Sequence, residues 1–163
     1  GRDREPHLGD RRCLVWVRPD PRPDEVAVIP PWAYAVAPLV GALGAFLRYA
    51  MVAAGSVAGE RRWNRNTATT HPFPTGVLVA NTLASLIAGI AVALTATGTT
   101  GRLLATAAFC GGLSTLSTLA VDTVSLWRAG RHTAAVLNLT VTAAAGVLAA
   151  YVGCLVARAL PGG

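Results

Sequence analysis

The sequence predicts an all-α membrane protein in which four transmembrane helices form a bundle. Three observations predict this fold: only 13% of the 163 residues are charged, the mean hydropathy is +0.48, and the apolar residues gather in four long runs. A soluble domain has about 25% charged residues, and a helix needs about 20 apolar residues to cross a bilayer. The net charge of +6 comes from scattered arginines without a basic face, which argues against nucleic-acid binding.

Residues 1–31 differ in composition from the rest of the chain. They mix charges of both signs with dense prolines, and such a segment cannot build an apolar core. The sequence therefore predicts a disordered polar tail over 1–31 and a membrane domain over 32–160.

The first predicted helix spans 32–54 and carries a stripe of small residues, Gly41, Gly44 and Ala45, followed on the same face by Arg48. Small residues let helices approach closely in lipid. Arg48 either snorkels to the interface beside a packing seam or sets a positive potential at the mouth of an anion path, and both can hold together. A polar loop is predicted over 59–74.

The second predicted helix spans 75–97 and places Asn81 inside the membrane. An embedded amide is either glue between helices or a ligand for a passing solute. A small face of Ala84, Ser85 and Gly89 is expected to leave room beside it.

The third predicted helix spans 102–127. Gly111 and Gly112 permit a break, and the freed carbonyls could bind a small cation. A run of hydroxyl residues follows: Ser114, Thr115, Ser117 and Thr118. Hydroxyls that bond back to helix carbonyls explain one or two such residues, but they explain this run poorly.

The fourth predicted helix spans 132–157, and short connections at 98–101 and 128–132 make consecutive helices antiparallel. Trp32, Trp63 and Trp127 lie at predicted helix ends, where indoles favour the membrane interface. Arginines are nearly balanced between the two sides of the membrane, so they set no orientation. The three cysteines show no paired spacing, and we expect neither a metal site nor a disulfide framework.

Several function classes are disfavoured by what the apolar runs lack. No Asp, Glu, His or Lys lies in the middle of a predicted helix, where a proton-coupled transporter normally has an ionisable side chain. Asp122 lies towards the end of the third helix. The sequence shows no nucleophile–base pair, metal-ligand cluster or phosphate loop, so we predict no enzyme. Neutral donors without a carboxylate suit passive movement of an anion.

Three segments, GALGAFLRY, PTGVLVAN and FCGGLSTLSTLAVDT, resemble the Fluc/CrcB fluoride channels in order and spacing. That family's signatures are roughly GGxxGAxxRY, GTLxVN and GFCGGLTTFSTFxxE. The resemblance covers residues 36–158. It implies a passive, fluoride-specific channel subunit that lowers cytoplasmic fluoride, in a bacterial plasma membrane. It also implies a dimer of oppositely oriented subunits, with two fluoride pores and a structural sodium ion (Na⁺) on the two-fold axis.

The resemblance also implies roles for individual residues. Those matched to the fluoride pore are Asn81, Thr115, Thr118 and Thr142, whereas Arg48 matches the vestibule arginine. Gly111 and Ser114 match the positions whose main-chain oxygens hold the sodium ion, and Asp122 takes the place of the usual glutamate.

The sequence departs from the family at pore positions. Leu116 and Leu119 stand where the family has phenylalanines, Asn138 where it has a tyrosine, and Ala84 where it has a glycine. Two alternatives stay open: a self-sufficient homodimeric channel, or a structural partner in a heterodimer whose second homologue supplies the phenylalanines. A small multidrug-type exporter is a more distant third, since the membrane-embedded glutamate that it needs is missing.

Overall fold

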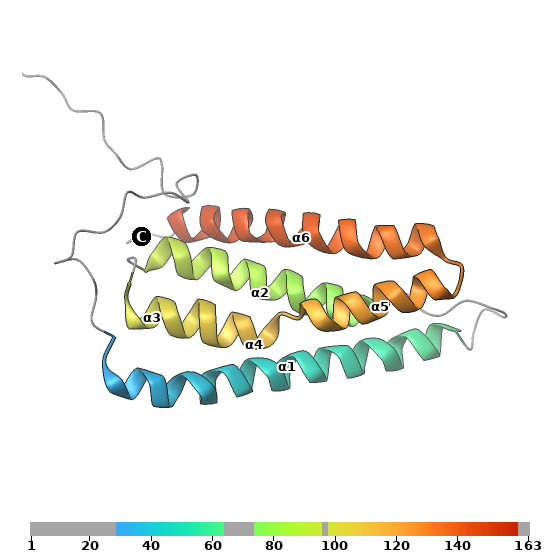
Figure 1. Ribbon diagram of the computed structural model, residues 1–163. Helices are drawn as coiled ribbons and strands as arrows, with labels where there is room; N and C mark the ends of the chain where they lie inside the picture. The colour runs from blue at the N-terminus through green and yellow to red at the C-terminus, as the bar shows by residue number, and fades with distance from the viewer. Residues whose placement is uncertain (1–28, 64–73, 96–97, 160–163) are drawn as a thin grey trace, which may run out of the picture.

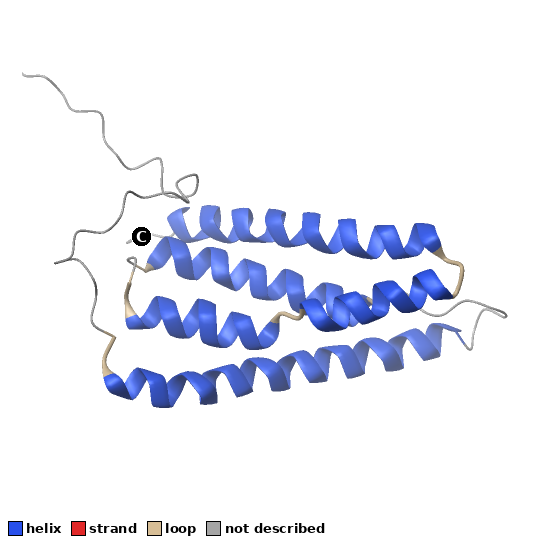
Figure 2. Ribbon diagram, viewed as in Figure 1, coloured by secondary structure: helices blue, strands red, loops and turns tan. Residues whose placement is uncertain are grey.

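The computed structural model describes residues 29–63, 74–95 and 98–159, with the side chains of 56–63 left out of the description. Nearly all of the predicted tail, 1–31, lies outside these residues. Helices and short loops make up the described chain (Figure 2).

Four membrane-length helical segments form the bundle (Figure 1). Helix α1 spans Pro31–Trp63 and α2 spans Thr75–Leu94. The third segment consists of α3 (Thr100–Arg102), a π-helix η3 (Leu103–Cys110), α4 (Gly111–Leu113) and α5 (Leu116–Arg128). Helix α6 spans His132–Ala159. All four segments are long and apolar enough to cross a membrane, which confirms a multi-pass membrane protein.

Two boundaries differ from the prediction by three residues or more, and the others agree to within two residues. Helix α1 continues to Trp63, so the first residues of the predicted loop are helical. Glu and Arg are good helix formers, and the polar residues after the apolar run can therefore extend the helix. Helix α2 ends at Leu94 because Thr95 is extended, with φ −114° and ψ 141°. Gly98 follows with φ 81°, a left-handed conformation that glycine adopts without strain.

Consecutive segments are antiparallel as predicted, so α2 and α6 run in the same direction (Figure 1). These two helices pack closely. A Cβ at Gly89 would overlap the backbone of Ala150, and one at Gly153 would overlap that of Leu86. Gly146 lies against Ser85 in the same seam. The expectation of open room beside Asn81 was therefore wrong, because α6 covers Ser85 and Gly89 and Ala84 packs against Cys110 and Leu113 of the third segment.

A second seam joins α1 to the third segment. A Cβ at Gly44 would meet the backbone of Phe109, and one at Gly112 would meet that of Gly41. The small stripe on α1 is thus a packing seam, as one of the two interpretations predicted.

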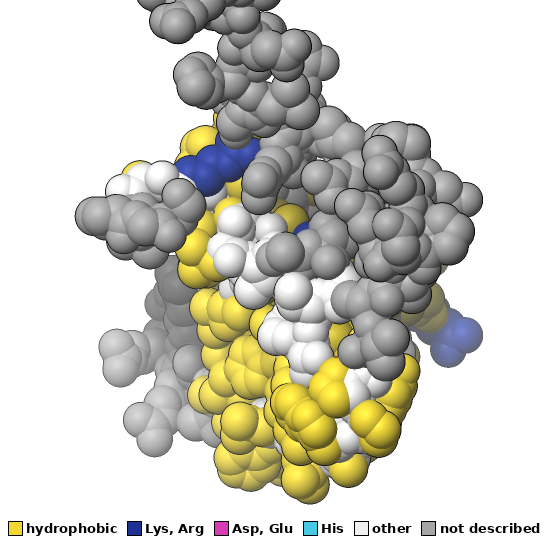
Figure 3. Space-filling view, turned by 90° about the vertical axis from the view of Figure 1, so that its left-hand side faces the viewer, with side chains coloured by type: hydrophobic (Ala, Val, Ile, Leu, Met, Phe, Trp, Pro, Cys, Tyr) yellow, Lys and Arg dark blue, Asp and Glu magenta, His cyan; other side chains and the backbone are white. Residues whose placement is uncertain are grey.

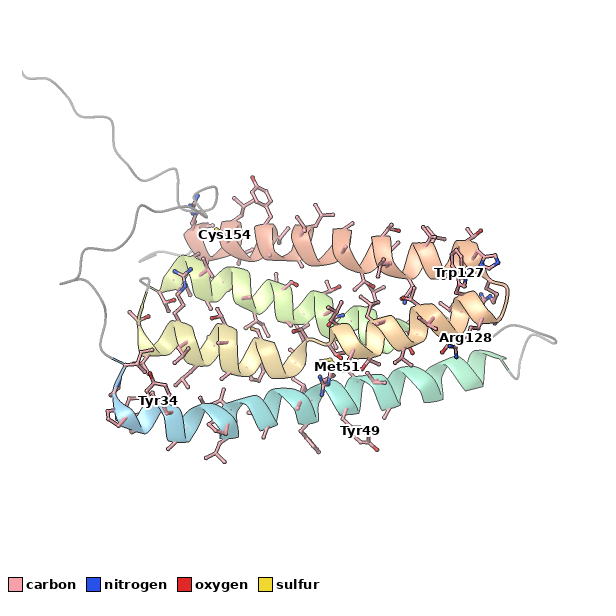
Figure 4. All side chains as sticks on the ribbon, in the orientation of Figure 1. Tyr34, Tyr49, Met51, Trp127, Arg128 and Cys154 are labelled. Atoms are coloured by element: carbon pink, nitrogen blue, oxygen red, sulfur yellow. The ribbon has the colours of Figure 1, made fainter. Side chains whose placement is uncertain are left out.

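The large apolar side chains mostly lie on the outside of the bundle. Leu39, Phe46 and Tyr49 are each more than two-thirds exposed, and Tyr49 points away from the other helices in Figure 4. Apolar side chains also cover much of the described surface seen from the end of the bundle (Figure 3). Such a surface suits lipid or another protein in a membrane.

Aromatic residues mark the bundle ends, with Tyr34 at one end and Trp127 at the other (Figure 4). Trp32 lies in the first turn of α1 and Trp127 in the last turn of α5, and both are more than half exposed, as the interfacial prediction requires. Cys110 is a buried free thiol. Cys154 is disulfide-bonded, so the expectation for the cysteines was wrong at this residue.

Candidate functional site

The third membrane segment breaks at Ser114 and Thr115, between α4 and α5. Ser114 has φ −78° and ψ 155°, and Thr115 has φ −150° and ψ 116°, both extended. The break predicted at Gly111–Ser114 exists and includes Ser114, but Gly111 and Gly112 are helical, so it starts later than expected. Extended backbone is open to every residue and favours β-branched threonine, and the break therefore needs no glycine. Gly112 instead allows the close approach to α1.

Asn81 on α2 holds the break from the side. Its Oδ1 accepts a hydrogen bond of 2.7 Å from the main-chain N–H of Thr115, and its Nδ2 donates one of 3.2 Å to the Thr115 carbonyl oxygen. Thr115 is only 5% exposed. One side chain therefore pairs the main-chain N–H that the break leaves without a helical acceptor. It also adds a donor at the Thr115 carbonyl oxygen, which, as the N-cap of α5, already accepts the first hydrogen bond of that helix. A carboxamide has two N–H bonds, and this contact uses one of them.

The hydroxyl groups after the break bond to one another. The Thr115 Oγ1 caps α5 by accepting from the Thr118 main-chain N–H at 3.2 Å. It also lies 3.0 Å from the Thr118 Oγ1 and 3.2 Å from the Ser117 Oγ. This cluster confirms that back-bonding to helix carbonyls does not account for the hydroxyl run.

The break takes the usual helical donors away from two carbonyl oxygens. In a helix the Gly111 oxygen would accept from the N–H of Thr115, which donates to Asn81. The Ser114 oxygen would accept from the N–H of Thr118, which donates to the Thr115 hydroxyl. Gly111 and Ser114 are the two residues that the family resemblance matched to a sodium site.

Arg48 on α1 reaches the same place. Its Nη1 donates to the Ser114 carbonyl oxygen at 3.3 Å, and the side chain is half-buried. The guanidinium is therefore turned to the break, and snorkelling to the interface does not describe this contact. Its proposed role at a vestibule stays a prediction.

The two leucines at the family's phenylalanine positions face different surroundings. Leu116, in the first turn of α5, is 77% exposed, whereas Leu119, three residues later, is 6% exposed. Within one chain, therefore, Leu116 lies on the outer surface of the bundle and Leu119 lies in its interior.

Asn138 and Thr142 belong to a second polar group, on α6. Both side chains are buried, and the Asn138 Nδ2 donates to the Thr123 Oγ1 on α5 at 2.9 Å. Sequence reasoning missed Thr123, because nothing in the sequence relates a threonine on α5 to an asparagine beyond the next turn. It also missed Thr82, whose hydroxyl oxygen is buried. The only indication in the sequence was that Thr82 directly follows Asn81.

Comparison with known proteins places the chain in a family. The model of the CrcB-like proteins (Camphor Resistance, CrcB) matches residues 35–154. A fluoride-specific ion channel from Roseiflexus sp. is 33% identical over 124 residues, which cover 74% of this chain and 92% of that protein. A fluoride-specific ion channel from Thermobifida fusca is 38% identical over 112 residues, covering 69% and 84% of the two chains. This chain therefore belongs to the CrcB family, the family of the fluoride-specific ion channels.

Proposed function

We propose that the chain is a subunit of a fluoride-specific channel that lets fluoride leave the cytoplasm passively, down its gradient. The observation that carries this proposal is the cluster at the break, where the Asn81 amide, the Thr115 and Thr118 hydroxyls and the Arg48 guanidinium lie inside an apolar bundle. Fluoride is small and strongly hydrated, so only clustered N–H and O–H donors can replace its water. The relatives from Roseiflexus and Thermobifida bear the name of fluoride-specific channels, which supports the same substrate.

A structural sodium ion at the break is part of the proposal. The described residues contain no group of three or more His, Cys, Asp or Glu side chains that could hold a metal. The carbonyl oxygens of Gly111 and Ser114 suit a sodium ion, because unwound main-chain carbonyls bind this ion in membrane helices. Arg48 already donates to the Ser114 oxygen, so the guanidinium and the ion would compete for it or share it.

We further propose that two oppositely oriented subunits form the channel, with the sodium ion on the two-fold axis. The exposure of Leu116 supports pores assembled from two chains, because this side chain points out of its own bundle while Leu119 points in. The second subunit is either another copy of this chain or a homologue that carries phenylalanines at these positions.

The missing aromatic edges favour a heterodimer as the conducting form. An aromatic edge at an anion contributes about 0.5–1 kcal/mol, by analogy with the attraction of a cation to the ring face. A homodimer would lack two such edges in each pore, and passage should then slow several-fold to tenfold or more. The Asn138 amide in place of tyrosine is a partial replacement at most.

The proposal is tested by fluoride-electrode efflux from liposomes that hold this chain, a phenylalanine-bearing homologue, or both together. We expect weak efflux from this chain alone and restored efflux from the mixture. Robust, fluoride-selective efflux from this chain alone would overturn the partner-subunit hypothesis and show that the chain forms a self-sufficient channel. Absence of fluoride efflux from the mixture, with the homologue active alone, would refute the channel function for this chain.

A further inference from the structure

Three buried oxygen atoms on α2 and α6 have no hydrogen-bond partner within the described part of the chain. They are the Thr82 Oγ1, the Asn138 Oδ1 and the Thr142 Oγ1. Asn138 is 0% exposed and Thr142 is 5% exposed. Buried polar atoms are almost always paired with protein or ordered water, and each exception needs a physical explanation.

Four other hydroxyls in these helices show the usual alternative, a hydrogen bond back to their own helix. Thr106, Thr123, Ser125 and Thr140 each donate to the carbonyl oxygen four residues earlier, at 2.7–2.9 Å. Thr82 and Thr142 lie within helices of the same kind, yet their hydroxyls do not make this bond. Their side chains are thus turned away from their own helices.

The helix register places the three residues within about one helical turn of one another. Ser85 on α2 lies against Gly146 on α6. One turn before this contact, the parallel helices carry Thr82 and Thr142 on their packed faces. Asn138 precedes Thr142 by four residues, so both lie on the same face of α6.

The direction of the Asn138 amide is set by its neighbour. The Thr123 hydroxyl donates its single hydrogen to the Leu119 carbonyl oxygen at 2.7 Å, so it can only accept from Asn138. The Asn138 Nδ2 must therefore face Thr123, and Oδ1 faces the other way. This group presents a buried acceptor that requires a donor.

We propose that the Asn138 Oδ1, the Thr142 Oγ1 and the Thr82 Oγ1 bind one ordered water molecule. A buried water makes about three hydrogen bonds, which matches these three atoms. Water can donate to the amide oxygen and exchange hydrogen bonds with the two hydroxyls. A dehydrated anion cannot take its place, because it has no hydrogen to give to the acceptor that lines the site.

The water site itself does not depend on the proposed function, but its consequence for transport does. If fluoride passes along α6, it meets an acceptor oxygen at Asn138 and must keep water at that level. This would make α6 of this chain a poorer fluoride path than one lined by donors alone.

The test is a structure of the full chain in lipid, at a resolution that shows ordered water, prepared once without fluoride and once with it. Water and fluoride carry equal numbers of electrons, so the comparison between preparations identifies the occupant. We expect a density peak at about 2.6–3.2 Å from all three oxygens in both preparations. No peak in either, or a peak that needs fluoride, would overturn the proposal.

A variant pair tests the ligands. Thr82→Val with Thr142→Val keeps the side-chain shape and removes both hydroxyls, so the peak should disappear. Thr140→Val is the matched control, because the Thr140 hydroxyl is exposed and bonds within its own helix; the peak should remain. A peak of full occupancy in the double variant would show that these hydroxyls are not its ligands. If the double variant does not fold, the two structures of the unchanged chain decide alone.

Discussion

Asn81→Ser should open the helix break and abolish fluoride efflux. Serine is too short to reach both main-chain groups of Thr115, which Asn81 holds at 2.7 and 3.2 Å. Thr115 is 5% exposed, so water cannot readily replace the lost partners. The substitution leaves the buried N–H without a partner and takes one of two donors from the carbonyl oxygen, which keeps the first hydrogen bond of α5.

The magnitude follows mainly from the Thr115 N–H. A buried polar group without a partner costs about 1–3 kcal/mol, so the closed arrangement of the break should lose about that amount. A loss of about 2 kcal/mol raises the open population about 30-fold, since about 1.4 kcal/mol corresponds to a factor of ten.

Hydrogen–deuterium exchange of the break measures this opening. The Thr115 amide should exchange about 30-fold faster in Asn81→Ser than in the unchanged chain. Liposome efflux and a sizing column complete the measurement, and we expect lost fluoride transport with the oligomer intact. Asn81→Asp separates the support of the break from the donation of a hydrogen bond to fluoride. A carboxylate still accepts from the Thr115 N–H but offers no donor. Its Thr115 amide should stay protected while efflux is lost.

Two outcomes would refute this reasoning at different points. An Asn81→Ser protein whose Thr115 amide exchanges as slowly as before would show that Asn81 does not hold the break. A folded Asn81→Ser protein with full efflux would show that Asn81 is no part of the fluoride path. Thr140→Val is the control for general loosening, and it should leave exchange at the break unchanged.

Three further predictions concern the seam, the sodium site and the leucines. Gly112→Ala puts a methyl group against the α1 backbone and should lower the free energy of unfolding by about 1–3 kcal/mol. At Gly111 the nearest atom to an added methyl group lies at 4.0 Å, so Gly111→Ala should change the free energy of unfolding by no more than roughly 0.5 kcal/mol. Thermal melting in detergent compares the two, and equal losses would contradict the packing. Arg48→Gln removes the guanidinium cation from the Ser114 carbonyl oxygen. Efflux should then reach half its maximum at a lower sodium concentration. An unchanged or higher half-maximal sodium concentration would exclude competition between Arg48 and sodium for this oxygen. Leu116→Phe with Leu119→Phe should raise efflux from this chain alone several-fold, and no rise would show that the missing aromatics do not limit it.

Composition and periodicity were enough to place the four spans, because a bilayer selects long apolar helices whatever their neighbours are. The same reasoning found a break in the third segment and a polar role for Asn81. It placed the start of the break too early, at Gly111, because the two glycines are compatible with both backbone freedom and close packing, and only their contacts tell these apart.

Which polar groups meet depends on how the helices are rotated and shifted against one another. Asn81 bonds to a residue 34 positions away and Arg48 to one 66 positions away. The glycine seams of α1 and α6 set these registers through backbone contacts that a hydropathy pattern does not encode. For that reason three features emerge only once the helices are packed: the two hydrogen bonds from Asn81 to Thr115, the direction of the Asn138 amide, and the three oxygens on α2 and α6 that have no partner among the described residues.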